Sequence, residues 1–147
     1  MKDYGTNTSR TGIVKWTAMS YFYFYNYRMF KHNFQYEDYL NTLPHTSANL
    51  FMKFRLLNHK LPIQKGRFLG IERNERLCQK CNINEIGDEF HYIFKCPFFT
   101  NSRRQFLKPY FWKYPNTLKF SALFNSSNKT ILKNLVAFIR IILQTFK

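Results

Sequence analysis

The sequence predicts a mainly α-helical domain, and three observations favour this class. Segments 50–61 and 131–146 each place apolar residues on one face at helical spacing. Prolines interrupt the chain between the predicted helices, at positions 44, 62, 97 and 109. All three cysteines fall within 19 residues, which indicates a Cys-x2-Cys knuckle rather than a framework of disulfides. The 147 residues therefore predict one small helical domain with such a knuckle.

The first half of the chain contains one well-defined predicted helix. Residues 1–30 form a basic and aromatic segment that we expect to be partly loose. Residues 34–40 are compatible with a short helix. A longer helix is expected from an N-cap at Thr46 or Ser47 to about Asn58, with Lys53, Arg55 and Lys60 away from its apolar face. That face consists of Leu50, Phe51, Phe54, Leu57 and Leu61. Pro62 should stop the helix, and residues 63–70 should form a connector.

Three further helices are expected after Cys81. Asp88 is a suitable N-cap for a short helix over 89–95, which Pro97 ends because the residue before a proline avoids the helical region. A second short helix is expected over 98–106. The last, over about 128–146, has a broad apolar face. We expect residues 31–112 to form a central module and residues 113–147 to supply a C-terminal amphipathic helix packed on it.

The charge of the chain indicates a polyanionic partner. Lysine and arginine number 23 against 8 acidic residues, which gives a net charge of +15. Such an excess is typical of proteins that bind nucleic acid, although a lysine-rich source could produce it by composition alone. The 58 residues after Glu89 contain no carboxylate side chain. Enzymes that use Mg²⁺ on nucleic acid need clustered carboxylates, and no Ser/His/Asp set or Gly-rich phosphate loop is recognisable, so we expect no enzymatic activity.

The cysteines and one histidine follow the spacing Cys78-x2-Cys81-x9-His91-x4-Cys96. A Cys-x2-Cys turn lets two thiolates converge on one ion, and four protein ligands leave no open position, which is typical of structural Zn²⁺. We therefore expect one structural zinc, in a zinc-stabilised domain. Three thiolates, a neutral imidazole and Zn²⁺ sum to −1, and the nearby cations Arg76, Lys80 and Lys95 should offset that charge. The alternatives are buried reduced cysteines beside a core histidine and, less favoured, a redox Cys-x2-Cys.

The ligand geometry agrees with the position of the proline. On an α-helix, residues five apart point ~140° away from each other, so His91 and a helical Cys96 could not face one ion. Pro97 should force Cys96 off the helix and let its thiolate turn back. The other histidines, His32, His45 and His59, have no ligand spacing and are expected at the surface.

Several segments together resemble a known family. They are Lys53-Phe54-Arg55-Leu56-Leu57-Asn58-His59-Lys60-Leu61, Gly66-Arg67, Glu75-Arg76-Leu77-Cys78-x2-Cys81, Asp88-Glu89-Phe90-His91 and Lys95-Cys96-Pro97. From about Phe34 to Leu107 the chain resembles the zinc-binding CCHC region downstream of the reverse transcriptase in non-LTR retrotransposons, a class of transposable element. The resemblance implies a role in holding template RNA or target DNA. The chain departs from the family because it lacks a Tyr-x-Asp-Asp polymerase motif and a nuclease acid cluster, so transposition activity is not implied.

Nucleic acid should be held by phosphate contacts and by stacking. We expect nine basic side chains to neutralise phosphates: Lys53, Arg55, Lys60, Lys65, Arg67, Arg73, Arg76, Arg103 and Arg104. Exposed rings such as Tyr92, Phe98 or Phe99 could stack on unpaired bases, although the spacing of Phe90, Phe94 and Phe98 favours core packing. Little sequence preference is expected.

A second hypothesis is an interaction module or decayed fragment that docks on a reverse transcriptase chain without binding nucleic acid. A third, membrane association by the C-terminal helix, is less favoured because its polar face carries few charges. We expect RNA or DNA as the partner, no small-molecule substrate and no membrane. No signal peptide is recognisable, so an intracellular location, nuclear or cytoplasmic, is expected.

Overall fold

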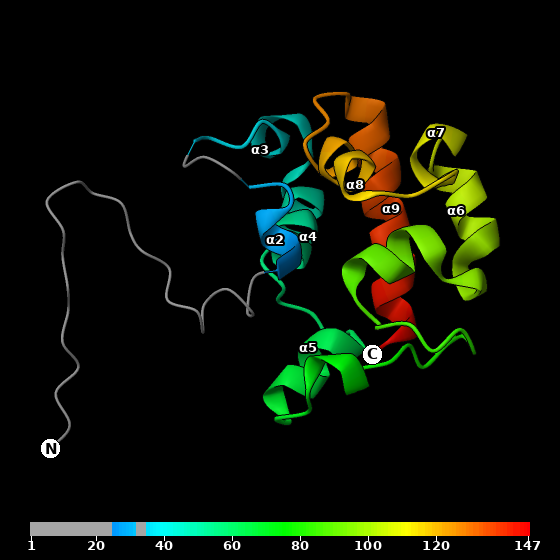
Figure 1. The fold of residues 1–147 in the computed structure, drawn as a ribbon. Helices are drawn as coiled ribbons and strands as arrows, with labels where there is room; N and C mark the ends of the chain where they lie inside the picture. Colours follow the sequence, from blue (N-terminus) through cyan, green and yellow to red (C-terminus); the bar gives the residue numbers. More distant parts are fainter. Residues whose placement is uncertain (1–24, 32–34) are drawn as a thin grey trace, which may run out of the picture.

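The computed structural model describes residues 25–31 and 35–147 (Figure 1). Most of the expected loose segment at 1–30, together with His32, lies outside the described residues. Within them the chain is mainly helical and contains no β-strand, and an isolated antiparallel bridge joins Leu77 to Ile86. The predicted fold class is therefore confirmed. None of the helices in the described part of the chain is both long and apolar enough to cross a bilayer.

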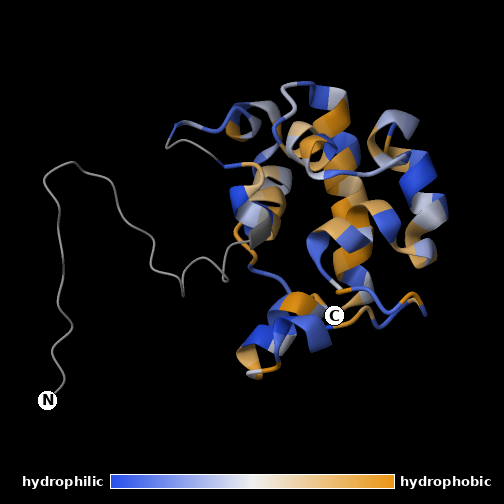
Figure 2. Ribbon diagram, in the orientation of Figure 1, coloured by the Kyte–Doolittle hydropathy of each residue, from blue (hydrophilic) through white to orange (hydrophobic). Residues whose placement is uncertain are grey.

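Helix α9 (Lys129–Thr145) forms the centre of the core. The side chain of Asn128 caps it by accepting hydrogen bonds from the backbone N–H groups of Thr130 and Ile131 at 3.0 and 3.1 Å. Helices α4 (His45–Arg55), α6 (Thr100–Phe106) and α8 (Thr117–Phe124) pack around it. Figure 2 shows the apolar residues concentrated along α9. The buried ones are Leu132, Leu135, Val136, Phe138, Ile139 and Ile142.

Short elements join these helices, and three of them begin at a proline. They are α2 (Tyr25–Arg28), α3 (Tyr39–Thr42), α5 (Pro62–Phe68), the 3₁₀ turn η1 (Arg73–Glu75), the π-helical turn η2 (His91–Lys95), the 3₁₀ turn η3 (Pro97–Phe99) and α7 (Pro109–Trp112). The expected connector at 63–70 is wrong, because Pro62 starts α5 and does not end the preceding helix. Proline suits a first helical position, where no intrahelical N–H bond is lost.

Both ends of helix α4 differ from the sequence prediction, and helix α8 is an additional element. Helix α4 ends at Arg55 rather than near Asn58, because Leu57 adopts a left-handed conformation with φ of 60°. Its N-cap is Pro44, whose side chain makes no capping bond. Helix α8 was not expected at all, and its N-cap Asn116 accepts a hydrogen bond from the N–H of Lys119 at 2.9 Å.

Aromatic rings fill the space between α4 and α8. The ring of Phe124 stacks on Phe30, Phe51 and Phe54 with centroid distances of 5.0, 5.5 and 6.1 Å. Stacked and tilted rings of this kind add to the energy of apolar burial. Phe120 extends the cluster toward the candidate metal centre, since it contacts Phe94 at 5.7 Å.

Arg55 is buried in this aromatic cluster, so its predicted position on the exposed face of the helix is wrong. The residue is 3% exposed, and its guanidinium carbon lies 4.7 Å from the ring centroid of Phe30. It donates a hydrogen bond to the carbonyl of Phe124 at 2.8 Å and pairs with Glu37 at 3.0 Å. Burial lowers the pKa of Arg55, while the charge of Glu37 acts in the opposite direction. Arg55 therefore joins α4 to the end of α8.

Replacing this guanidinium should destabilise the domain. We expect Arg55→Met to lower the free energy of unfolding by about 1–3 kcal/mol, because the buried carbonyl of Phe124 loses its donor. The exposed neighbour Lys53 gives the matched control, and Lys53→Met should change stability by no more than about 0.5 kcal/mol. Urea unfolding followed by circular dichroism measures both. Equal stabilities for the two variants would contradict the buried role of Arg55.

Candidate metal centre

The four predicted ligands converge at one point. The three cysteine sulfurs and one ring nitrogen of His91 all lie within 4.8 Å of one another. Cys78 Sγ lies 3.8 Å from Cys96 Sγ, and Cys81 Sγ lies 3.4 Å from His91 Nε2. Cys78, His91 and Cys96 are buried, while Cys81 is half-buried. The chain therefore contains a Cys₃His group positioned to hold a metal ion.

The Cys-x2-Cys turn is held by backbone pairing at its base. The N–H of Cys78 donates to the carbonyl of Glu85, and the N–H of Gly87 donates to the carbonyl of Arg76, both at 2.8 Å. Gly87 has no room for a side chain, because a Cβ there would lie 2.8 Å from the Tyr92 hydroxyl oxygen and 3.2 Å from Cys78 Cα. The two ends of the loop, at residues 76–78 and 85–87, therefore lie side by side, and the thiols of Cys78 and Cys81 can point to the same place.

The π-helical turn η2 allows His91 and Cys96 to face the same ion, although the two residues are five apart in the sequence. The N–H of Cys96 donates to the carbonyl of His91 at 2.8 Å, which is a bond between residues five apart. A π-turn is wider than an α-turn, so it brings residues five apart toward the same side. Cys96 then leaves the helix with ψ of 120°, just before Pro97. The prediction that Cys96 lies off the helix is confirmed, and the π-turn is an addition to it.

The capping of this segment agrees with the prediction for Asp88. Its side-chain oxygen Oδ1 accepts a hydrogen bond from the N–H of His91 at 2.9 Å. Its other oxygen, Oδ2, pairs with Arg73 at 3.2 Å. This capping carboxylate fixes the start of the turn that carries the histidine ligand.

Glu85 orients the histidine ring from outside the ligand set. Its Oε2 lies 3.1 Å from His91 Nδ1, and its Oε1 pairs with Lys95 Nζ at 2.9 Å. Burial raises the pKa of Glu85, but hydrogen bonds with Lys95 and His91 outweigh it and bring the pKa below its ordinary value. A carboxylate on Nδ1 leaves Nε2 as the ligand atom. Sequence reasoning missed Glu85, because nothing in its spacing marks it.

Arg103 is a structural cation beside the centre, so its assignment to phosphate binding is wrong. It is 5% exposed. It donates to the carbonyls of Ile93 and Cys96 at 2.8 Å and of Tyr92 at 3.3 Å, all within or just after η2. Burial lowers its pKa to about 10, so it stays charged at neutral pH. The sequence does contain an indication of this burial. Arg103 is four residues from both Phe99 and Leu107, so it lies on the apolar helical face that these two residues define.

The thiols are in an electrostatic environment that favours a bound cation. Burial and the neighbouring thiols Cys78 and Cys81 raise the pKa of Cys96 to about 12. Burial also acts to raise the pKa of Cys78, but hydrogen bonds from Tyr92, Lys80 and Cys81 bring it below its ordinary value. The bond from Lys80 comes from its backbone N–H, which lies 3.4 Å from Cys78 Sγ. A metal ion would offset the charge that three thiolates accumulate.

The other cations predicted to contact phosphate keep full or partial access to solvent. Lys53, Lys60, Lys65 and Arg104 are exposed, whereas Arg67, Arg73 and Arg76 are half-buried. Arg67 lies 4.9 Å from the ring centroid of Phe68, and Arg76 donates to the carbonyls of Ile71 and Ile63 at 2.8 and 3.2 Å. Arg55 and Arg103 are excluded from this surface by burial. The remaining seven keep their assignment as predictions.

Three other side chains are less accessible than expected. Tyr92 and Phe99 are 0% and 2% exposed, so neither ring can stack on a base, whereas Phe98 is 57% exposed. His59 is not a surface residue, since its side chain is 1% exposed and its Nε2 lies 2.9 Å from Glu89 Oε1. Gln64 donates to the same Glu89 oxygen at 3.3 Å. His45 is exposed, as predicted.

No family model matches the chain, and no match is found among curated proteins or solved structures.

Removing the carboxylate behind His91 should weaken metal binding. We expect Glu85→Ala to lower the affinity about 10- to 100-fold, because the ring loses the partner that orients it. Glu75→Ala removes an exposed carboxylate of η1 and is the control with equal charge. Competition with a chromophoric zinc chelator measures both. Unaltered affinity in Glu85→Ala would contradict the orienting role.

Proposed function

We propose that this chain is a structural zinc-binding module that holds RNA or DNA with little sequence preference, as part of the machinery of a reverse transcriptase. The observation that carries the proposal is the geometry of the Cys₃His group. Its resemblance to the CCHC region of non-LTR retrotransposons supports the same reading.

Two distances between ligand atoms match those expected for a tetrahedral zinc ion. With Zn–S bonds of about 2.3 Å, two sulfurs on a tetrahedron lie about 3.8 Å apart. A sulfur and a nitrogen at about 2.05 Å from the metal lie about 3.5 Å apart. The Cys78 and Cys96 sulfurs are separated by 3.8 Å, and Cys81 Sγ lies 3.4 Å from His91 Nε2. Three soft thiolates with one imidazole favour zinc over Mg²⁺ or Ca²⁺, which prefer oxygen ligands.

The zinc is proposed to be structural, and the module is proposed to be no enzyme. Four protein ligands fill a tetrahedral site and leave no position for water or substrate. The residues between His91 and Cys96 support this role, because Tyr92, Ile93 and Phe94 are buried in the core. The metal would therefore join the Cys-x2-Cys loop to the hydrophobic interior.

Nucleic-acid binding is supported by the charge that remains at the surface. The net charge is +15, and burial removes Arg55 and Arg103 from what a partner can reach. Exposed lysines on α4, on α5 and between them persist, and such cations bind phosphates without reading bases.

An interaction module is the alternative, and a specific observation favours it. Tyr110, Tyr114 and Leu118 of the α7–α8 region are 64%, 88% and 80% exposed. Exposed apolar residues gathered in one region are typical of protein contacts. A chain that binds zinc but no nucleic acid would favour this alternative.

Metal content tests the zinc proposal. Protein purified without added metal should contain about one zinc per chain by elemental analysis, and chelation should reduce its helicity, because the ligands fix η2 and the core residues within it. Cys81→Ser should lower the zinc content, whereas Ser102→Ala, in α6, should not. Protein without zinc, whose circular dichroism is unchanged by chelation, would disprove the proposal.

Salt dependence tests the nucleic-acid proposal. Binding of a fluorescent 12-nucleotide single strand, measured by anisotropy, should weaken about 50-fold between 50 and 200 mM salt if roughly four phosphates are neutralised. An uncharged morpholino strand of the same sequence is the control and should bind weakly at both salt concentrations. No binding of the charged strand at 50 mM would contradict the proposal.

A further inference from the structure

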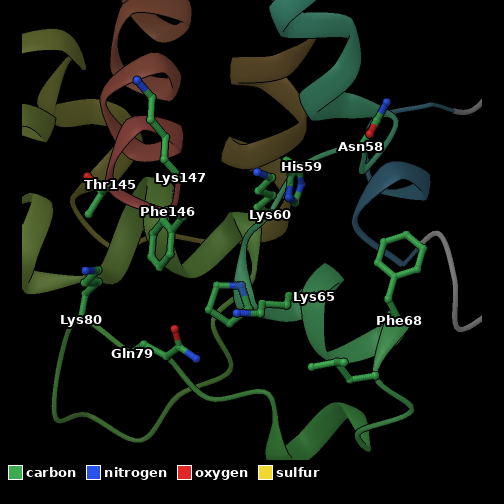
Figure 3. Close-up of a pocket in the computed structure, with 12 residues that line it drawn as sticks. Asn58, His59, Lys60, Lys65, Phe68, Gln79, Lys80, Thr145, Phe146 and Lys147 are labelled. Carbon is green, nitrogen blue, oxygen red and sulfur yellow. The ribbon is translucent and has the colours of Figure 1, made fainter.

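A cleft of about 740 Å³ opens beside the knuckle (Figure 3). Three segments that are distant in the sequence line it: residues 58–69 around α5, residues 79–80 of the Cys-x2-Cys loop, and residues 145–147 at the end of α9. Its size falls within the range of pockets that bind small molecules, about 300–1,000 Å³. The residue types in its walls indicate the kind of ligand.

The cleft is lined by positive charge. Four of its twelve lining residues are lysines, Lys60, Lys65, Lys80 and Lys147, and none of the twelve has a carboxylate side chain. Figure 3 shows these lysines on different walls. The neighbouring carboxylate of Glu89 is buried and bound by His59 and Gln64. Four like charges around one concave space repel one another, so an anion in the cleft would be stabilised.

Two phenylalanines give the cleft an apolar component. Phe68 is 78% exposed, and the guanidinium of Arg67 lies 4.9 Å from its ring centroid. Phe146 is held in place by Tyr92, with 4.9 Å between their centroids, and Lys80 Nζ lies 5.4 Å from its ring. An exposed ring beside lysines offers one surface for a base and another for a phosphate.

We propose that this cleft holds a phosphate and its neighbouring base from an unpaired nucleic-acid strand, with the base against Phe68 and the phosphate among the four lysines. A duplex keeps its bases stacked inside the helix, so it would gain nothing from a ring in a concave site. The inference rests on the proposed nucleic-acid binding and assigns it to one place on the surface. Sequence reasoning identified Lys60 and Lys65 as phosphate contacts but not Lys80, Lys147, Phe68 or Phe146.

The metal ligands and the cleft share one loop. Gln79 and Lys80 line the cleft and lie between the ligands Cys78 and Cys81. The backbone N–H of Lys80 donates to Cys78 Sγ at 3.4 Å. Ligation of the two cysteines would therefore fix the wall from which Lys80 projects.

Two matched variants of the zinc-loaded full chain test the role of the lysines. The cleft variant combines Lys60→Gln, Lys65→Gln, Lys80→Gln and Lys147→Gln. The control combines Lys108→Gln, Lys113→Gln, Lys129→Gln and Lys133→Gln, which are exposed lysines outside the cleft. For a 12-nucleotide thymidine strand, the cleft variant should lose about 10-fold or more in affinity, and its salt slope should fall by about 0.7, the value for one phosphate contact on a single strand. The control should keep its slope.

A second pair of variants tests stacking. Phe68→Ala should weaken binding of the strand by about 5-fold or more, because a stacked base loses its partner. Tyr114→Ala removes a ring of 88% exposure that does not line the cleft and should leave the affinity unchanged. Zinc content and the unfolding midpoint verify that every variant is folded. If a fourfold lysine variant fails either check, its four single lysine substitutions are tested in its place.

The outcomes separate the cleft from the broader function. If the unaltered chain binds the strand but the cleft and control variants lose affinity equally, nucleic-acid binding stands and the cleft is overturned. If the unaltered chain binds a 12-base-pair duplex more tightly than the strand, or polyglutamate displaces the strand equally well, the assignment to an unpaired strand is overturned. If it binds neither nucleic acid, the proposed function fails together with this inference.

Discussion

The hydrogen bond from the Cys96 N–H to the His91 carbonyl is the constraint on which the candidate metal centre depends. It closes a turn one residue wider than an α-turn. On one side of this turn, His91 and Cys96 meet the two cysteines of the knuckle. On the other, Tyr92, Ile93 and Phe94 are buried in the core. Metal ligation and hydrophobic packing would therefore act on the same segment, residues 91–96, and each would restrict the conformation that the other needs.

Two buried arginines show that the total charge overstates what a partner can reach. Arg55 binds the last carbonyl of α8, and Arg103 binds three carbonyls of the turn around η2. Each supplies donors to backbone oxygens that helix ends leave without intrahelical partners. A planar guanidinium can satisfy several carbonyls at once, which lysine cannot do with the same geometry. Their substitution would therefore act on stability before it acted on any contact with nucleic acid.

The parts of the fold that local spacing determines could be predicted from the sequence. The helical class, the ligand set and helix α9 follow from periodicity, capping and metal-ligand spacing. Pro62 and Pro109 were read as stops although proline also suits the first position of a helix. Burial of Arg55 depends on Phe124 and Glu37, which are distant in sequence, so helical spacing could not reveal it. The role of Glu85 likewise appears only when the loop folds against His91.

The shared loop gives the metal centre a consequence beyond stability. Lys80 lies between two metal ligands and also lines the cleft. If ligation fixes the position of Lys80, an anion bound in the cleft must favour the ligated form, because coupling between two binding sites is reciprocal. The coupling would arise from ordering one short loop and would need no movement of the helical core. A metal that is structural in coordination would thus be linked, through a single lysine, to the surface where a partner would bind.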